Sequence, residues 1–183
     1  MESTGLDPHM HSIIEFGAVL DDLECPFRLD ELPTFHCYFI QDNYVGSPFA
    51  LSMHPEILRR IAEREPPHTY VKPMKFGHMF KKFLLENEYE EDGQRVYINA
   101  AGKNFAACDL QFLKMQTDIE KHVRIRHKVL DPGPMFMRVD DEQIPGLSEC
   151  KERAGLDNVV AHDAVSDAMD VVKLIRWKML GRI

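Results

Sequence analysis

Four ionisable side chains stand where an α/β protein commonly builds chemistry: Glu2, Asp109, His162 and Asp167. Each lies near the end of an expected strand or the start of an expected helix, which is where such folds place their sites. Three carboxylates gathered without a positive side chain beside them would repel one another. Mg²⁺ or Mn²⁺, which prefer oxygen ligands, would make such a cluster stable. The residue types therefore indicate a candidate metal-dependent site.

The spacing of His162 and Asp167 in AHDAVSDA constrains where the histidine can lie. On one regular helix, side chains five positions apart point in directions roughly 140° apart. His162 must therefore sit in the approach to the helix if it shares a site with Asp167. Asp163 is a fair N-cap residue for that helix, which agrees with this geometry.

Each of these residues also has an ordinary explanation when it is considered alone. A glutamate near an N-terminus is commonly a surface charge. Asp109 would favour the first turn of a helix through the helix macrodipole. A histidine five residues before an aspartate is frequent by chance. The ordered set, rather than any single motif, points to a shared site.

The elements that must position these residues alternate along the chain. Apolar and β-branched runs predict strands at 13–20, 34–40 and 95–102, and a short strand at 128–136 that breaks at Pro132. Apolar residues at helical spacing predict helices at 54–65, 73–87, 107–119 and about 163–180, with a short helix within 142–156. The basic segment 121–128 is expected to be a solvated helix end or loop, with contact to a phosphate backbone as the alternative. This order predicts a layered α/β fold in a single domain, residues 1–183.

Composition excludes several classes of protein. The net charge of −8 argues against a broad, non-specific nucleic-acid binder, although metal ions can supply the positive charge needed to hold one chain end. Long apolar runs and a basic, apolar leader are absent from the sequence, so we expect no membrane span and a cytoplasmic location. The four cysteines match no zinc or redox spacing and are expected to be free, mostly buried thiols.

Three sequence segments resemble the motifs of the DEDDh 3′–5′ exonucleases, a family that includes RNase T, oligoribonuclease and polymerase proofreading subunits. ESTGLDP followed by IIEFGAVLDD resembles the first motif, Asp-x-Glu-(Thr/Ser)-Thr-Gly and a following strand. AGKNFAACDLQFL resembles the second motif, and HDAVSDA resembles the third, His-x-x-x-x-Asp followed by a small residue. The motifs occur in family order and span almost the whole chain.

The resemblance implies a fold and a set of roles. The fold would be RNase H-like: three layers, with a mixed five-stranded sheet covered by helices on both faces. Glu2, Asp109 and Asp167 would bind two divalent ions, Mg²⁺ or Mn²⁺, and His162 would be the general base. Two ions about 4 Å apart can activate a water and stabilise a leaving 3′ oxygen, and a histidine suits the proton transfer.

The resemblance also implies a substrate. The family releases nucleoside 5′-monophosphates from the 3′ end of DNA or RNA, so the expected partner is a single-stranded 3′ end or a short oligonucleotide. Thr4, Gly5 and Leu6 match positions that hold the terminal nucleotide through backbone contacts and apolar packing. Asn104 and Phe105 lie in the second motif and are further substrate-binding candidates, with a place in the core as the alternative for Phe105.

The sequence departs from the family pattern at the first metal-binding aspartate. That aspartate precedes the glutamate by two residues, so its place falls immediately before Met1, and the apolar run that normally leads into it is missing too. We expect that Met1 is the variable residue of an Asp-Met-Glu sequence inside a longer coding sequence. If the chain truly lacks this segment, we expect a sheet without its middle strand and impaired binding of two metal ions.

Two other functions compete with a metal-dependent exonuclease. A non-catalytic nucleic-acid- or protein-binding relative on the same fold would explain the absent aspartate and the acidic charge. A cysteine hydrolase using Cys108 and His162 is less well supported, because the sequence shows no oxyanion-hole motif. The sequence does not decide whether the substrate is DNA or RNA, how long it is, or which oligomeric state the protein has. Its acidic net charge favours short substrates.

Overall fold

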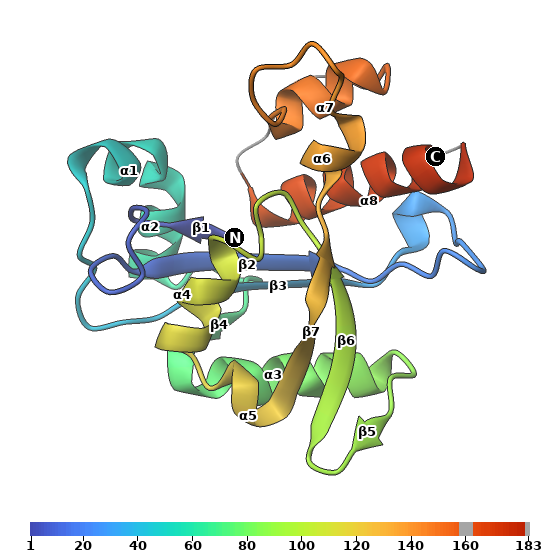
Figure 1. Cartoon of the computed structure of the whole chain (residues 1–183). Coiled ribbons are helices and arrows are strands. Elements are labelled where there is room, and N and C mark those ends of the chain that lie inside the picture. The colour runs from blue at the N-terminus through green and yellow to red at the C-terminus, as the bar shows by residue number, and fades with distance from the viewer. Residues whose placement is uncertain (158–162, 182–183) are drawn as a thin grey trace.

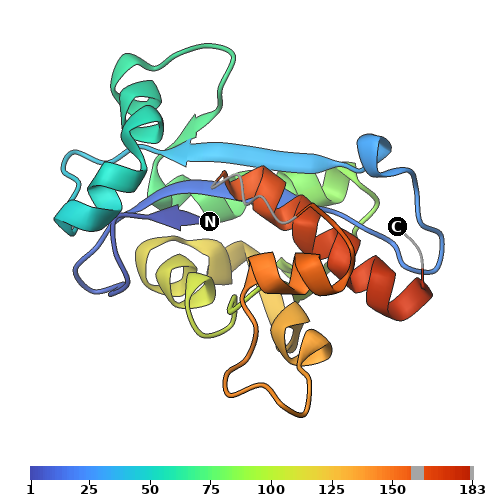
Figure 2. The ribbon, with the colours of Figure 1, turned by 90° about the horizontal axis from the view of Figure 1, so that it is seen from above.

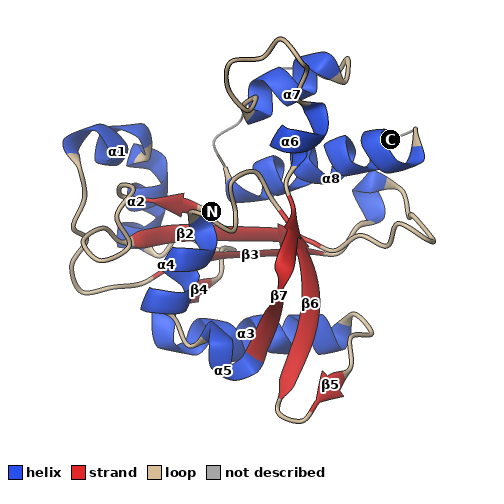
Figure 3. Ribbon diagram, in the orientation of Figure 1, coloured by secondary structure: helices blue, strands red, loops and turns tan. Residues whose placement is uncertain are grey.

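The strands form two separate sheets in the computed structural model, which describes residues 1–157 and 163–181 of the 183-residue chain. The protein is a mixed α/β structure (Figures 1 and 3). A four-stranded sheet has the order β1-β2-β3-β4: β1 (Glu2–Ser3), β2 (Ile13–Val19), β3 (Thr34–Phe39) and β4 (Tyr70–Val71). A three-stranded sheet has the order β5-β6-β7: β5 (Glu91–Asp92), β6 (Arg95–Ala101) and β7 (Val123–Leu130).

Helices connect and cover these strands. In chain order the described α-helices are α1 (Pro48–Met53), α2 (Pro55–Glu63), α3 (Pro73–Glu86), α4 (Asp109–Gln116), α5 (Ile119–His122), α6 (Pro132–Phe136), α7 (Leu147–Arg153) and α8 (Ala164–Leu180). A short 3₁₀ turn, Leu29–Glu31, lies between β2 and β3. Proline occupies the first position of α1, α2, α3 and α6, where its missing N–H costs no helical hydrogen bond.

Strand pairing sets the direction of each segment. β1 and β3 both run antiparallel to β2, and Glu2 lies opposite Glu15 in the first of these pairs. β4 is parallel to β3, and β6 is parallel to β7. The β1 pairing reaches only the start of β2, because β1 begins at Glu2.

Helices cover both faces of the four-stranded sheet. Figures 1 and 2 show α8 lying along β2 on one face and α3 on the opposite face. The approach of α8 to the sheet is closest at Gly17, where an added Cβ would meet the backbone carbon of Ala164 at 2.5 Å. Glycine at this position therefore lets the start of α8 rest directly on β2.

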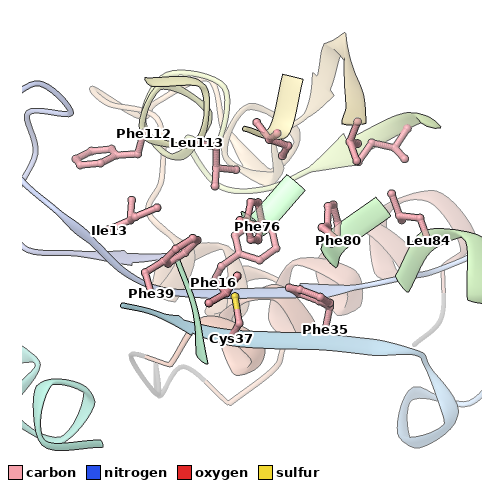
Figure 4. Packing of buried hydrophobic residues seen from close by; sticks show 14 of the residues in the cluster. Ile13, Phe16, Phe35, Cys37, Phe39, Phe76, Phe80, Leu84, Phe112 and Leu113 are labelled. Atoms are coloured by element: carbon pink, nitrogen blue, oxygen red, sulfur yellow. The ribbon is translucent and has the colours of Figure 1, made fainter. Parts of the chain in front are cut away.

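The main core fills the space between α3 and the two sheets. Phe16, Phe35 and Phe39 project from β2 and β3 toward Phe76 and Phe80 of α3, with the rings arranged largely edge to face (Figure 4). Residues of β6, α4 and β7 complete the same cluster from the other sheet: Val96, Ile98, Phe112, Leu113 and Val123. One continuous apolar cluster thus joins both sheets.

Most predicted elements are confirmed, and the errors concentrate between residues 121 and 136. Strands at 13–20, 34–40 and 95–102 correspond to β2, β3 and β6, and the predicted helices correspond to α2, α3, α4, α7 and α8. The basic segment 121–128 was expected to be a helix end or loop, but most of it is β7. The short strand predicted within 128–136 is confirmed for 128–130, where it is the end of β7, and it breaks before Pro132 as expected; the residues from Pro132 on form α6.

The expected single five-stranded sheet is not what the described residues form. The layered α/β class is confirmed, but β2 and β6 belong to different sheets. All four cysteines are free; Cys37 and Cys150 are buried, whereas Cys25 and Cys108 are exposed, so half of them depart from the expected burial. Among the described helices, none combines the length and apolar character needed to cross a membrane.

Candidate active site

Glu2 lies on β1, at the point where β1, the start of β2 and His54 meet. The side chain of Glu2 is 15% exposed, and its Oε2 is 3.2 Å from Nε2 of His54, which is itself buried. His54 precedes Pro55 at the junction of α1 and α2. The pairing of Glu2 with Glu15 directs both side chains to the sheet face that α8 covers, because directly opposite residues of an antiparallel pair point to the same face.

Asp109 is the first residue of α4, after the loop that leaves β6. Its Oδ1 lies 3.9 Å from the amino nitrogen of Met1. Burial raises the pKa of Asp109, and the positive charge at Met1 opposes that rise. This contact brings the beginning of the chain beside the second of the predicted carboxylates.

Asp167 lies in the first turn of α8. Asp163 caps this helix by accepting a hydrogen bond from the backbone N–H of Ser166 at 3.0 Å, which confirms the predicted N-cap. The cap fixes the residue at which α8 begins, and this sets the position of the Asp167 carboxylate in the first turn. His162 lies outside the described residues.

The electrostatics of Glu2 connect the three predicted carboxylates. Burial raises the pKa of Glu2 from its ordinary 4.5 to about 7. The negative charges of Asp167 and Asp109 contribute to this rise, and the amino group of Met1 opposes it. Two carboxylates from distant segments of the chain therefore act on the largely buried carboxyl of Glu2.

Glu15 is a fourth acidic residue at this place, and the sequence reasoning missed it. It is 2% exposed, accepts a hydrogen bond from the backbone N–H of Ala164 at 3.0 Å, and lies 2.8 Å from Nε2 of His36. Its charge also raises the pKa of Glu2. The signal in the sequence was a glutamate inside an otherwise apolar strand, IIEFGAV, because such a residue is buried only when it has partners.

The donor set fits a hard divalent cation by its chemistry. Glu2, Asp109 and Asp167 supply only carboxylate oxygens, and Mg²⁺ and Mn²⁺ prefer such ligands. The amino nitrogen of Met1 lies beside Asp109, and His54 lies beside Glu2. Within residues 1–157 and 163–181, no three histidine, cysteine or acidic side chains stand close enough together to hold an ion.

Thr4 organises the turn that follows Glu2. Its hydroxyl accepts a hydrogen bond from the backbone N–H of Ser12 at 2.7 Å and donates one to the carbonyl of Val45. Its backbone N–H and carbonyl bond to Ser12 and Ser47 at 2.8 and 2.9 Å. The polar groups of Thr4 are thus occupied within the protein, and its expected contact with a nucleotide stays a prediction.

Gly5 and Leu6 follow Thr4 in this turn; Gly5 is buried and Leu6 is exposed. A Cβ on Gly5 would meet the ring of His11 at 2.5 Å, so the close approach of that ring requires glycine. Leu6 is 93% exposed, which leaves its whole side chain available to a planar apolar group. The exposure of Leu6 is compatible with its predicted role, and the role itself stays a prediction.

Asn104 and Phe105 lie in the loop between β6 and α4. Asn104 has a left-handed backbone conformation with φ of 57°, and its N–H donates to Oδ2 of Asp131 at 2.9 Å. Phe105 is partly buried against the main core, and it also lines a large groove. Phe105 is therefore at least in part a core residue, as the alternative interpretation held.

The groove that Phe105 lines has a volume of about 2040 Å³. It lies between β2 and β6, and Met1, Asp109 and Asp167 also line it. Asp109 and Asp167 therefore stand at an opening large enough to admit a polymer, since pockets for small molecules are typically about 300–1,000 Å³. Glu2 is not among the residues that line it.

Comparison of the sequence with protein-family models and with curated proteins finds no match. The functional assignment of this site therefore depends on its own residues and geometry.

Proposed function

We propose that the protein is a metal-dependent 3′–5′ exonuclease that hydrolyses the terminal phosphodiester bond of DNA or RNA and releases nucleoside 5′-monophosphates. The observation that supports this proposal best is that Asp109 and Asp167, which lie far apart in the sequence, line the same groove as Met1, the residue next to Glu2. The three segments carrying these residues are the ones that resemble the DEDDh motifs. The two sheets and their covering helices would be parts of an RNase H-like fold.

Each residue has a distinct role in this proposal. Glu2, Asp109 and Asp167 would hold two Mg²⁺ or Mn²⁺ ions, which supply charge stabilisation at the scissile phosphate and acidify a bound water. His162 directly precedes Asp163, the N-cap of α8, and would accept the proton of the attacking water. Leu6 would pack on the terminal base, with Gly5 allowing close approach of the backbone.

The acidic charge of the protein bears on the length of the substrate. A long track of phosphate contacts requires many basic side chains, and the net charge here is −8. β7 does supply positive charge at the groove, because Arg126 and Lys128 both line it. The guanidinium of Arg126 lies 5.8 Å from the centre of the Tyr97 ring. A short substrate held at its 3′ end suits this distribution of charge.

A labelled single-stranded oligonucleotide incubated with Mg²⁺ or Mn²⁺ tests the proposal. The expected result is a ladder of products shortened from the 3′ end, strongly reduced in Asp109→Asn and Asp167→Asn. Asp140→Asn is the matched control, because Asp140 is exposed and lies in the segment between α6 and α7. Activity that survives both site variants would contradict the proposed roles.

A second candidate function is a non-catalytic binding protein on the same fold. The absence of three close histidine, cysteine or acidic side chains among residues 1–157 and 163–181 favours it, because two metal ions need such a set of ligands. The same experiment separates the two candidates. Binding of the oligonucleotide without any cleavage in Mg²⁺ and Mn²⁺ would support the binding protein.

A further inference from the structure

One face of the three-stranded sheet is exposed to solvent. Val96, Ile98 and Val123 point to its other face, where they pack in the main core with α3. Because successive side chains of a strand point to opposite faces, the alternate positions of β6 and β7 form the exposed surface. We call it the outer face, and its residues are Arg95, Tyr97, Asn99, Arg124 and Arg126. In Figure 1, α3 crosses behind β6 and β7, so the two strands are seen from the side opposite to this helix.

The outer face places three arginines around one aromatic ring. The register of the parallel pair sets Tyr97 opposite Arg124, and Arg126 follows on the same face two residues along β7. Arg95 lies two residues before Tyr97 on β6. The guanidinium of Arg126 lies 5.8 Å from the centre of the Tyr97 ring, a distance at which a cation is attracted to the ring face. The sheet thus brings together charges from two segments that are distant in the sequence.

The positive charge of the outer face is only partly neutralised within the protein. Among residues 1–157 and 163–181, no carboxylate forms an ion pair with Arg95 or Arg126. Arg124 lies 3.4 Å from Glu120, but both side chains are about half exposed, so water screens this pair. Asp92, opposite Arg95 in the β5–β6 pair, is a further acidic neighbour. In a protein of net charge −8, the outer face therefore keeps an excess of positive charge.

Protection of a sheet edge explains only part of this pattern. Charged side chains on an edge strand prevent pairing with other chains, and β7 is an edge strand. Arg95 and Tyr97, however, lie on β6, the central strand of this sheet, where such protection is not needed. Tyr97 is 41% exposed. An accessible aromatic ring among positive charges suits single-stranded nucleic acid, whose bases stack on rings and guanidinium groups while its phosphates contact the cations.

We propose that the outer face binds single-stranded nucleic acid, with phosphates contacting Arg95, Arg124 and Arg126 and a base stacking at Tyr97. The proposal gives a role to most of the basic segment 121–128, which forms β7. The eight residues of β7 span about 25 Å at about 3.3 Å per residue. This length corresponds to about seven nucleotides at the 3.4 Å spacing of stacked bases. The outer face is therefore sized for a short oligonucleotide.

The place of the outer face beside the groove sets which part of the strand it holds. Tyr97 and Arg126 line the same groove as Asp109 and Asp167. This step rests on the proposed function: with the terminal nucleotide at the aspartates, the outer face holds nucleotides on its 5′ side. Binding to the outer face itself requires neither a metal ion nor cleavage.

Binding of a fluorescein-labelled single strand of about twenty nucleotides, measured by fluorescence anisotropy in EDTA over a series of salt concentrations, tests the proposal. Two triple variants with the same change in charge are compared: Arg95→Gln, Arg124→Gln and Arg126→Gln against Lys72→Gln, Lys75→Gln and Lys82→Gln. The control lysines are exposed on α3 or at its N-cap, across the core from the outer face. Each phosphate contact contributes about 0.7 to the slope of log K against log salt concentration. We expect the slope to be smaller by about 2 in the arginine variant and unchanged in the lysine variant.

Tyr97→Leu and Tyr97→Phe separate stacking from charge. Leucine keeps an apolar side chain but lacks a ring, so we expect binding about tenfold weaker, while phenylalanine should bind like the unmodified chain. Equal salt slopes in the two triple variants would overturn the proposal. Polyglutamate that competes as well as the oligonucleotide would also overturn it, because the outer face would then bind anions in general.

The binding site and the proposed function fail separately. Binding that depends on the three arginines, without any cleavage in Mg²⁺ or Mn²⁺, would overturn the exonuclease and support the outer face. Cleavage that is lost in Asp109→Asn but has an unchanged KM in the arginine variant would support the exonuclease and overturn the outer face as a substrate site.

Discussion

The carboxylate of Glu15 accepts a hydrogen bond from the backbone N–H of Ala164 at 3.0 Å, across 149 positions of the chain. It thereby fastens the middle of β2 to the first residue of α8, the helix that carries Asp167. A carboxylate satisfies a helix N-terminus well, because the first N–H groups of a helix have no partners within it and the macrodipole is positive there. Glu15 is therefore a structural support of the candidate site.

We expect Glu15→Ala to destabilise the protein by about 2–4 kcal/mol. The substitution leaves the buried N–H of Ala164 without its acceptor, which costs about 1–3 kcal/mol, and it also removes the contact of the partly exposed His36 ring. Urea unfolding at pH 7 measures the loss. Glu24→Ala, at an exposed glutamate, should change stability by less than about 0.5 kcal/mol. A Glu15 variant as stable as the Glu24 variant would contradict the role assigned to this hydrogen bond.

Gly17→Ala tests the direct contact between β2 and α8. The new methyl group would lie 2.5 Å from the backbone carbon of Ala164 and 2.6 Å from the nitrogen of Val165, so the helix must move. We expect a loss of about 1–3 kcal/mol, typical of overpacking. Gly146→Ala is the control, since nothing lies within 4 Å of its added Cβ. Equal stability of the two variants, measured by thermal unfolding, would show that the start of α8 can move away from β2 without loss of stability.

The sequence predicted most elements because their apolar patterns are local. Helical spacing marked α3 and α8, and β-branched runs marked β2 and β3. β7 was missed because its exposed positions carry arginine, histidine and lysine, so that VRIRHKVL has the appearance of a charged surface segment. Only pairing with β6, a contact between distant segments, makes it a strand. The helix α6 was missed because proline at its start was taken as a strand end.

The sequence suggested the candidate carboxylates but not the residues around them. Glu2, Asp109 and Asp167 were chosen for their chemistry and order, and their shared site stays a prediction; the charges of Asp167 and Asp109 contribute to the raised pKa of Glu2. His54 and Glu15 have no motif of their own, and their nearness to Glu2 depends on how α2 and β2 pack. The division into two sheets follows from strand pairings, which local patterns do not specify.

Breaking the ion pair between Arg176 and Asp21 should destabilise the protein far more than breaking an ion pair on the surface. It joins the last half of α8 to the loop after β2, and both side chains are nearly buried. Nε of Arg176 donates to Asp21 at 2.9 Å, and Nη1 donates to the carbonyl of Phe27 at 2.8 Å. Removing the charge of Asp21 leaves the buried guanidinium of Arg176 without its counter-ion. We therefore expect Asp21→Asn to lower the free energy of unfolding by about 3–5 kcal/mol, as measured with urea.

The exposed pair of Arg28 and Asp30 provides the control for this prediction. Both side chains are mostly in water, where an ion pair is screened and contributes about 0–1 kcal/mol. Asp30→Asn should therefore leave the free energy of unfolding almost unchanged. If Asp21→Asn were equally mild, the contact between α8 and the loop after β2 would not depend on charge.

The raised pKa of Glu2 predicts a pH dependence of stability with a definite sign. Its pKa is about 7 in the folded protein and about 4.5 in the unfolded chain, so the folded state holds the proton more tightly between these values. The stabilisation that comes from this tighter proton binding by Glu2 is complete below pH 4.5 and is lost as the pH rises through 7. Glutamine cannot ionise, so Glu2→Gln should gain about 2–3 kcal/mol relative to the unmodified chain between pH 4.5 and 8. Urea unfolding of both proteins across this range measures the difference in the free energy of unfolding. For the control Glu24→Gln, this difference should not change with pH. If it also did not change with pH for Glu2→Gln, the pKa of Glu2 would not be raised in the folded protein.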